Sequence, residues 1–157
     1  MAVRPATAAD VRAADAVRVA GWKAAYRDLV PQAYLDRLMV TDARVAWLTD
    51  RLEDQDAQTL VAVEGKAVVG MAVHGPGRDP DLPGLRELYA LYVHPSHWRR
   101  GTGTELLAAC GPVDMLWVLE GNERGRAFYE RHGFRPDGTA KTLDLDGPVL
   151  EVRYRLA

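Results

Sequence analysis

The chain has 157 residues, of which 48% are hydrophobic and 27% charged, as expected for one globular domain with a core. Lys and Arg total 20 against 22 Asp and Glu, so the formal net charge is -2, which argues against a general nucleic-acid binder. A single cysteine, Cys110, excludes an intrachain disulfide. With no secretory signal and no apolar run of membrane-span length, we expect a cytoplasmic protein without membrane association.

The first third of the chain is predicted to be mostly helical. A short strand over residues 2–4 precedes Thr7 and Asp10, which fit a capping box for a helix running to about Ala20. Pro31 favours the start of a second helix over residues 32–38, and Thr41 can cap a third over residues 42–52.

The remainder of the chain alternates strands with two helices. Strands are predicted at residues 59–64, 67–74, 85–93, 113–119, 139–145 and 149–156. The first helix follows a glycine-rich turn and stops at Gly111-Pro112, and the second runs from Asn122 to Gly133. This order predicts a single α/β domain with a central mixed, mostly antiparallel twisted sheet flanked by helices.

One strand-to-helix turn has the character of an anion site. The strand ends at Val93, and Gly101 and Gly103 let backbone N–H groups approach a ligand at the positive end of the helix dipole. Further donors follow from the side chains of Arg99, Arg100, Thr102 and Thr104. The alternative is a plain turn with solvated arginines, and the segment matches neither a Rossmann fingerprint nor a P-loop.

Two motifs resemble the GCN5-related N-acetyltransferase (GNAT) superfamily. Leu91-Tyr92-Val93-His94-Pro95 and Trp98-Arg99-Arg100-Gly101-Thr102-Gly103 are similar to the strand and the Gln/Arg-x-x-Gly-x-Gly/Ala pyrophosphate motif of that family. The stretch from Asn122 through Phe128-Tyr129 to Gly133-Phe134 is similar to Asn-x-x-Ala-x-x-Phe-Tyr-x-x-x-Gly-Phe. The resemblance implies one N-acetyltransferase domain over residues 1–157, with coenzyme A (CoA) held between two splayed parallel strands.

Three departures from the family pattern stand out. Trp98 occupies a position where Gln or Arg is usual, so that contact must come from Arg99, Arg100 or the backbone. Gly125 replaces a common Ala, which costs helix stability. Gly111-Pro112 ends the first motif's helix early. None of the three removes a catalytic group.

The resemblance implies acetyl-CoA as the acyl donor and direct attack by a primary amine of a small molecule or peptide. Backbone N–H groups of Leu91, Tyr92 and Val93 would hold the cofactor and polarise the thioester carbonyl. The other positions that match the family's cofactor contacts are Trp98, Arg99, Arg100, Gly101, Thr102, Gly103, Thr104, Asn122 and Phe128. The four histidines lack metal-ligand spacing, so no metal is expected.

Tyr129 and Glu87 are the predicted catalytic residues. Tyr129 matches the tyrosine that protonates the leaving thiolate, although it could instead form the apolar side of its helix. Glu87 matches the glutamate that acts as general base in histone acetyltransferases of the superfamily. The alternatives are that Glu87 pairs with a cation such as Arg86, and that Glu120 is the base.

The acceptor site is expected to involve the N-terminal helices. Trp22 and Tyr26 would line it, whereas Trp47 is predicted to pack in the core. Acidic residues such as Asp28, Asp36, Asp79 and Asp81 favour a cationic acceptor, but solvated loop charge explains them equally well.

Two other functions remain open at the level of sequence. The chain could be a non-catalytic acyl-CoA binding or sensing module, against which Tyr129 argues. It could also be a toxin that acetylates aminoacyl-tRNA, which the net charge of -2 does not support. A homodimer is compatible with the resemblance, because many relatives dimerise.

Overall fold

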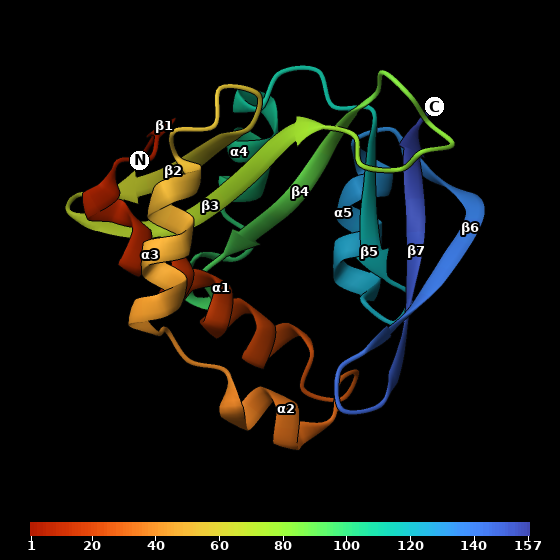
Figure 1. Cartoon of the computed structure of the whole chain (residues 1–157), viewed down its shortest axis with the longest axis horizontal. Helices are drawn as coiled ribbons and strands as arrows, with labels where there is room; N and C mark the ends of the chain where they lie inside the picture. The colour runs from red at the N-terminus through yellow and green to blue at the C-terminus, as the bar shows by residue number, and fades with distance from the viewer.

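The computed structural model describes residues 1–157 and contains one sheet of seven strands in the order β1-β2-β3-β4-β5-β7-β6 (Figure 1). Every neighbouring pair is antiparallel except β4 and β5, which are parallel. The α/β fold with a mixed, mostly antiparallel sheet is therefore confirmed. The strands are β1 Ala2–Pro5, β2 Gln58–Glu64, β3 Ala67–Pro76, β4 Arg86–Val93, β5 Met115–Leu119, β6 Phe134–Asp144 and β7 Pro148–Leu156.

Helices cover both faces of this sheet. They are α1 Val11–Ala25, which follows a 3-10 turn at Ala8–Asp10, α2 Gln32–Arg37, α3 Asp42–Arg51, α4 Thr102–Ala109 and α5 Glu123–Arg131. Side chains of a strand alternate between faces, so Leu60 of β2 packs with Leu106 of α4, whereas the adjacent Val61 packs with Ala14 of α1. In Figure 1, α1 and α3 accordingly lie in front of the sheet and α4 behind it.

The parallel strands β4 and β5 stay together only briefly. Their last residue pair is Leu88 with Leu116, and β4 then continues to Val93 beside β3 alone. Tyr89 is an extra residue in β4 relative to β3, and a β-bulge of this kind bends its strand. The bulge follows directly on the last β4–β5 pair, so it accounts for the separation of the two strands in Figure 1.

Two elements extend about a helical turn or more beyond their predicted bounds. Helix α1 continues past Ala20 to Ala25, and its Gly21 is buried against β4, where an added Cβ would lie 3.8 Å from the carbonyl oxygen of Val93. Strand β6 begins at Phe134 rather than at residue 139, because it pairs with β7 on both sides of a register shift. No helix is long and apolar enough to cross a membrane.

The predicted packing of Trp47 in the core is wrong. Its side chain lies on α3 with 51% of its surface exposed, and no residue of that helix is buried. The guanidinium of Arg51 lies 4.4 Å from the centre of the indole ring, so the aromatic face is covered by a cation rather than by the core.

Candidate functional site

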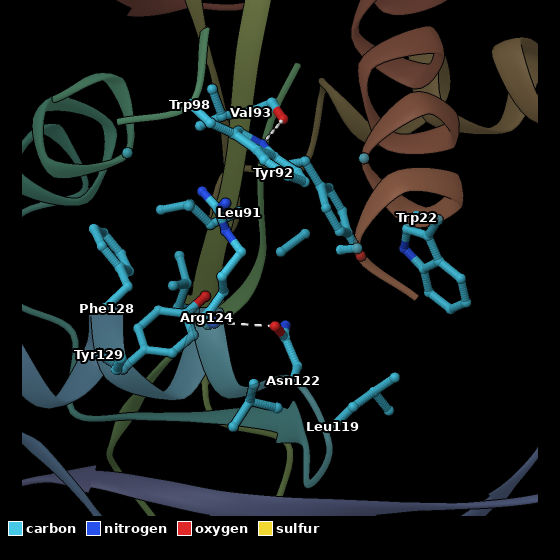
Figure 2. Close-up of a pocket in the computed structure, with 18 of the residues that line it drawn as sticks. Trp22, Leu91, Tyr92, Val93, Trp98, Leu119, Asn122, Arg124, Phe128 and Tyr129 are labelled. Atoms are coloured by element: carbon cyan, nitrogen blue, oxygen red, sulfur yellow. Dashed lines mark hydrogen bonds between the residues drawn. The ribbon is translucent and has the colours of Figure 1, made fainter. Parts of the chain in front are cut away.

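A cavity of about 630 Å³ opens where β4 and β5 separate. Its walls come from the end of α1, the end of β4, the glycine turn, α5 and the facing parts of β5 and β7. Figure 2 shows side chains from these separate elements converging on one space. All of the site residues predicted from the sequence line this cavity except Arg100 and Glu87.

The glycine turn presents backbone N–H groups to one end of the cavity. Arg99 and Gly101 both have positive φ, 63° and 82°, which turns the chain sharply into α4. The first hydrogen bond of that helix runs from Glu105 N to Gly101 O, so the N–H groups of the residues between them remain free for a ligand. The donors that this turn offers to the cavity are therefore backbone N–H groups.

The two threonines of this turn are used within the protein. The Thr102 hydroxyl is buried and donates to the sulfur of Met1 at 3.4 Å. Thr104 Oγ1 lies 3.2 Å from His132 Nε2, within hydrogen-bond distance. Their predicted contribution to a ligand is thus reduced to their N–H groups.

Trp98 stands where the family pattern has Gln or Arg, and an arginine from another element packs on its ring. Its indole Nε1 donates to Val93 O at 2.8 Å, which fixes the ring at the end of β4. The guanidinium of Arg124, from α5, lies 3.9 Å from the centre of this ring. Desolvation and then the charge of Arg99 lower the pKa of Arg124. Both arginines line the cavity. Arg124 was not recognised in the sequence, because it joins the turn only through the fold.

Tyr129 projects from α5 toward the middle of the cavity, below Leu91 (Figure 2). It is 9% exposed, and its hydroxyl makes no hydrogen bond within the protein. Burial, followed by the proximity of Tyr92 and Cys110, raises the pKa of Tyr129, so its proton is retained at neutral pH. A protonated, unpartnered hydroxyl is available as a proton donor.

Asn122 combines a helix cap with a place in the cavity wall. Its Oδ1 accepts from the N–H of Gly125 at 3.0 Å, the bond drawn in Figure 2. A Cβ at residue 125 would lie 2.5 Å from Asn122 Nδ2. The glycine that departs from the family pattern therefore leaves room for this orientation of Asn122.

Glu87 lies outside the cavity lining, although the sequence predicts it as the general base. It is 1% exposed, and Arg78 engages both carboxylate oxygens, through its backbone N–H at 3.0 Å from Oε1 and its Nη2 at 2.7 Å from Oε2. The predicted partner Arg86 instead contacts His74, with Nη2 3.1 Å from Nδ1. Glu120, the competing base, is exposed and also lies outside the lining.

The opposite end of the cavity is aromatic. Trp22 and Tyr26 line it from α1, as predicted, with their ring centres 4.9 Å apart. Trp117 and Glu151 line the same end from β5 and β7, and sequence reasoning missed both. Neither belongs to a motif, and only the pairing of β5 with β7 brings them to the site.

Asp79 and Asp81 of the β3–β4 loop form ion pairs with an arginine of β7, so they are not free charges that face an acceptor. Both pair with Arg153, at 3.1 and 2.8 Å. Asp79 also accepts from Trp117 Nε1 at 2.9 Å. No group of His, Cys, Asp or Glu is arranged to hold a metal ion.

Comparison with known proteins identifies the family. Residues 55–136, more than half of the chain, match the acetyltransferase (GNAT) domain. The chain belongs to the GNAT acetyltransferase family. The two motifs and the splayed strands are therefore GNAT features, and the resemblance seen in the sequence is confirmed.

Curated relatives within this family are moderately similar. The chain is 29% identical over 133 residues to an uncharacterized N-acetyltransferase of Bacillus subtilis, covering 84% of this chain and 66% of the relative. It is 37% identical over 103 residues to a probable N-acetyltransferase of Mycobacterium tuberculosis, covering 61% and 58%. The chain thus spans about two thirds or less of the curated relatives that it matches.

Solved GNAT structures have the same fold over nearly the whole chain. The PaiA N-acetyltransferase of Thermoplasma acidophilum, in complex with coenzyme A, superposes with a TM-score of 0.77 at 19% identity and 98% coverage of both chains. A ribosomal-protein-alanine N-acetyltransferase of Brucella melitensis gives 0.72 at 25% identity, also with 98% coverage of both.

Proposed function

We propose that this GNAT chain is an acetyl-CoA-dependent N-acetyltransferase that moves the acetyl group to a primary amine of a small molecule or peptide by direct attack. The observation that carries the proposal is Tyr129, a largely buried side chain whose hydroxyl has no hydrogen-bond partner in the protein and which lines the cavity where β4 and β5 separate. CoA complexes among the structural relatives support the choice of donor.

The residues present fit CoA. The free N–H groups at the start of α4, with Arg99 and Arg124 beside them, suit a pyrophosphate. Beyond Leu88 the β5-facing edge of β4 has no strand partner, so it can pair with an extended arm. CoA, when bound, supplies the activated acetyl group as a thioester.

The chain's own groups account for the remaining chemistry. N–H groups at the open edge of β4, over Leu91 to Val93, can donate to the carbonyl oxygen as negative charge develops there. Tyr129 gives its proton to the departing sulfur, since burial raises the pKa of Tyr129 and the phenol therefore stays protonated at neutral pH. Glu87 remains a predicted general base, but a carboxylate whose two oxygens are held by Arg78 is poorly placed to accept a proton.

The test is calorimetric titration with acetyl-CoA of the wild type, Gly101→Glu and Gly111→Glu. Both glycines have positive φ and open space around a new Cβ, so the two substitutions introduce similar strain and the same charge. Only Gly101 belongs to the turn that lines the cavity. We expect Gly101→Glu to abolish binding and Gly111→Glu to retain it.

Thiol release with a panel of primary amines then separates an enzyme from a binding module. Turnover with any amine excludes the non-catalytic acyl-CoA module. A wild type that binds no acetyl-CoA contradicts the proposed function as a whole.

A further inference from the structure

The cavity carries opposite charges at its two ends. Its lining cations, Arg99, Arg124 and Arg131, come from the glycine turn and α5. Its one lining carboxylate, Glu151, comes from β7 among the aromatic residues at the other end. If the cationic end takes the phosphates of the donor, the carboxylate end is left for the acceptor.

Strand pairing places Glu151 beside the gap between the splayed strands. It lies opposite Leu119, the last residue of β5, and opposite Lys141 of β6. Paired residues share a face of the sheet, so the Glu151 side chain projects from the same face as Leu119 and Trp117. Tyr129, on α5, packs with residues of the other face, such as Val118. Glu151 and Tyr129 thus approach the gap from opposite faces of the sheet.

The Glu151 carboxylate is half-buried and has few partners. Its side chain is 17% exposed, and its one ionic partner is Lys141, with Nζ 3.5 Å from Oε1. The side chain of Lys141 is 45% exposed, and its Nζ lies 3.9 Å from the centre of the Trp117 ring. The cation–π contact with this ring can hold the ammonium group when a ligand displaces it from the carboxylate. Glu87, in contrast, has both oxygens engaged by Arg78. A half-buried anion with a single ionic partner, itself partly exposed, favours a second cation.

The surroundings of Glu151 are apolar and aromatic. Trp22, Tyr26, Tyr92 and Trp117 line the same end of the cavity, and no arginine does. Trp22 Nε1 is buried without a hydrogen-bond partner, and its nitrogen edge faces Tyr92 in Figure 2. Aromatic faces attract ammonium groups and pack against apolar bodies, whereas a second carboxylate would meet Glu151 at close range.

We propose that Glu151 binds the ammonium group of the acceptor and takes its proton, and that the acceptor is a primary amine with an apolar or aromatic body and no carboxylate. This inference rests on the proposed function. The amine nitrogen loses one proton to Glu151, forms a bond to the carbonyl carbon, and the carbon–sulfur bond breaks. The sulfur takes the Tyr129 proton, the second nitrogen proton restores Tyr129, and Glu151 releases its proton to water.

The charged groups that act on Glu151 are few. Burial raises the pKa of its carboxyl, Lys141 and Arg78 oppose the rise, and Glu87 adds to it. An elevated pKa makes the carboxylate a better proton acceptor than an ordinary surface glutamate near neutral pH.

The experiment is titration of the CoA-saturated protein with phenethylamine, comparing the wild type with Glu151→Gln and with the exposed control Glu53→Gln. Loss of a charge-assisted hydrogen bond should weaken amine binding by about 10- to 100-fold in Glu151→Gln. Glu53→Gln should bind as the wild type does, and acetyl-CoA affinity should stay within about twofold in both variants. Phenylalanine, which adds a carboxylate to the same body, should bind the wild type at least about 10-fold more weakly.

A second variant keeps the test decisive if Glu151→Gln folds poorly. Lys141→Met removes the competing cation and retains an apolar stem against Trp117, so phenethylamine should bind about 3- to 10-fold more tightly. Unchanged amine binding in both variants, loss of binding in Glu87→Gln instead, or a preference for phenylalanine overturns the inference while acetyl-CoA binding still stands. Absence of acetyl-CoA binding by the wild type overturns the proposed function, and this inference with it.

Discussion

At the scale of single residues, the chemistry depends on which polar atoms the fold leaves without partners. Glu87 and Tyr129 both match family positions, yet Arg78 holds the carboxylate whereas the phenol hydroxyl is free. Glu151 matches no motif and still lines the cavity. A side chain's type and spacing therefore identify candidates, and its remaining hydrogen-bonding capacity selects among them.

Tyr129→Phe should lower kcat by about 100-fold or more while acetyl-CoA affinity changes by less than about twofold, because the hydroxyl acts on the leaving sulfur and makes no bond in the protein. Since burial raises the pKa of Tyr129, the alkaline loss of wild-type activity should begin above the ordinary tyrosine range, as the acid deprotonates. The variant should lack that limb. Thiol release measured across neutral and alkaline pH checks both points, and an unchanged kcat would remove Tyr129 from the mechanism.

At the scale of elements, the bulge at Tyr89 and the glycine turn make the site. The bulge separates β4 from β5, and the turn directs N–H groups into the resulting space. Helix α5 completes the anion end, because Arg124 lies over Trp98. At the family position that normally holds Gln or Arg, this chain therefore has Trp98 with the Arg124 guanidinium stacked on its ring.

Trp98→Leu should weaken acetyl-CoA binding by about 3- to 10-fold, because Arg124 loses the ring that positions it. Trp47→Leu is the matched control: Trp47 also lies under an arginine, Arg51, but far from the cavity lining. Calorimetric titration of both variants measures the difference. Equal affinities would show that the Trp98–Arg124 pair does not contribute to the anion site.

At the scale of the whole molecule, one buried arginine ties the β3–β4 loop to the C-terminal strands. Arg153 is 5% exposed on β7 and pairs with Asp79 and Asp81 of the loop and with Asp137 of β6, the last at 2.6 Å. Because Asp79 also accepts from Trp117, this network holds the loop against the aromatic end of the cavity. Stability and the shape of this end of the cavity are therefore coupled.

Arg153→Met should destabilise the fold by about 3 kcal/mol, because it leaves partly buried carboxylates without a cation. Arg12→Met, which breaks an exposed pair with Asp42, should cost less than about 1 kcal/mol. The pKa of Asp81 is lowered by its hydrogen bonds to Arg153, and that of Asp137 is lowered despite burial by Thr139 and Arg153. Lowered values mean that this stabilisation is present above the unfolded pKa and is lost as pH falls through the folded one.

Urea unfolding at neutral and acidic pH measures these effects. The wild type should lose stability on acidification, and Arg153→Met should show a smaller loss, because its carboxylates no longer gain from being ionised. A variant as stable as the wild type, with the same acid dependence, would contradict the role of the network.

The sequence by itself determined the elements and the family. Several of these signals are local: the helix caps at Thr41 and Asn122, the hairpin turns and the glycine turn. Each depends only on the backbone hydrogen bonds and dihedral angles of a few neighbouring residues. The family resemblance located about half of the cavity lining, including Trp22, Tyr129 and the turn at Gly101. The ends of elements were predicted less well where tertiary packing extends them. Helix α1, for example, continues to Ala25 because Gly21 packs against β4.

Only the tertiary structure decided which charges face the cavity. Glu151 reaches it because β7 pairs with β5 beside Leu119, and Arg124 reaches the turn because α5 packs next to Trp98. Trp47 was wrongly placed in the core, because an indole on a surface helix can remain half exposed with an arginine over its ring. Burial and pairing depend on residues far apart in the chain, and no local pattern records them.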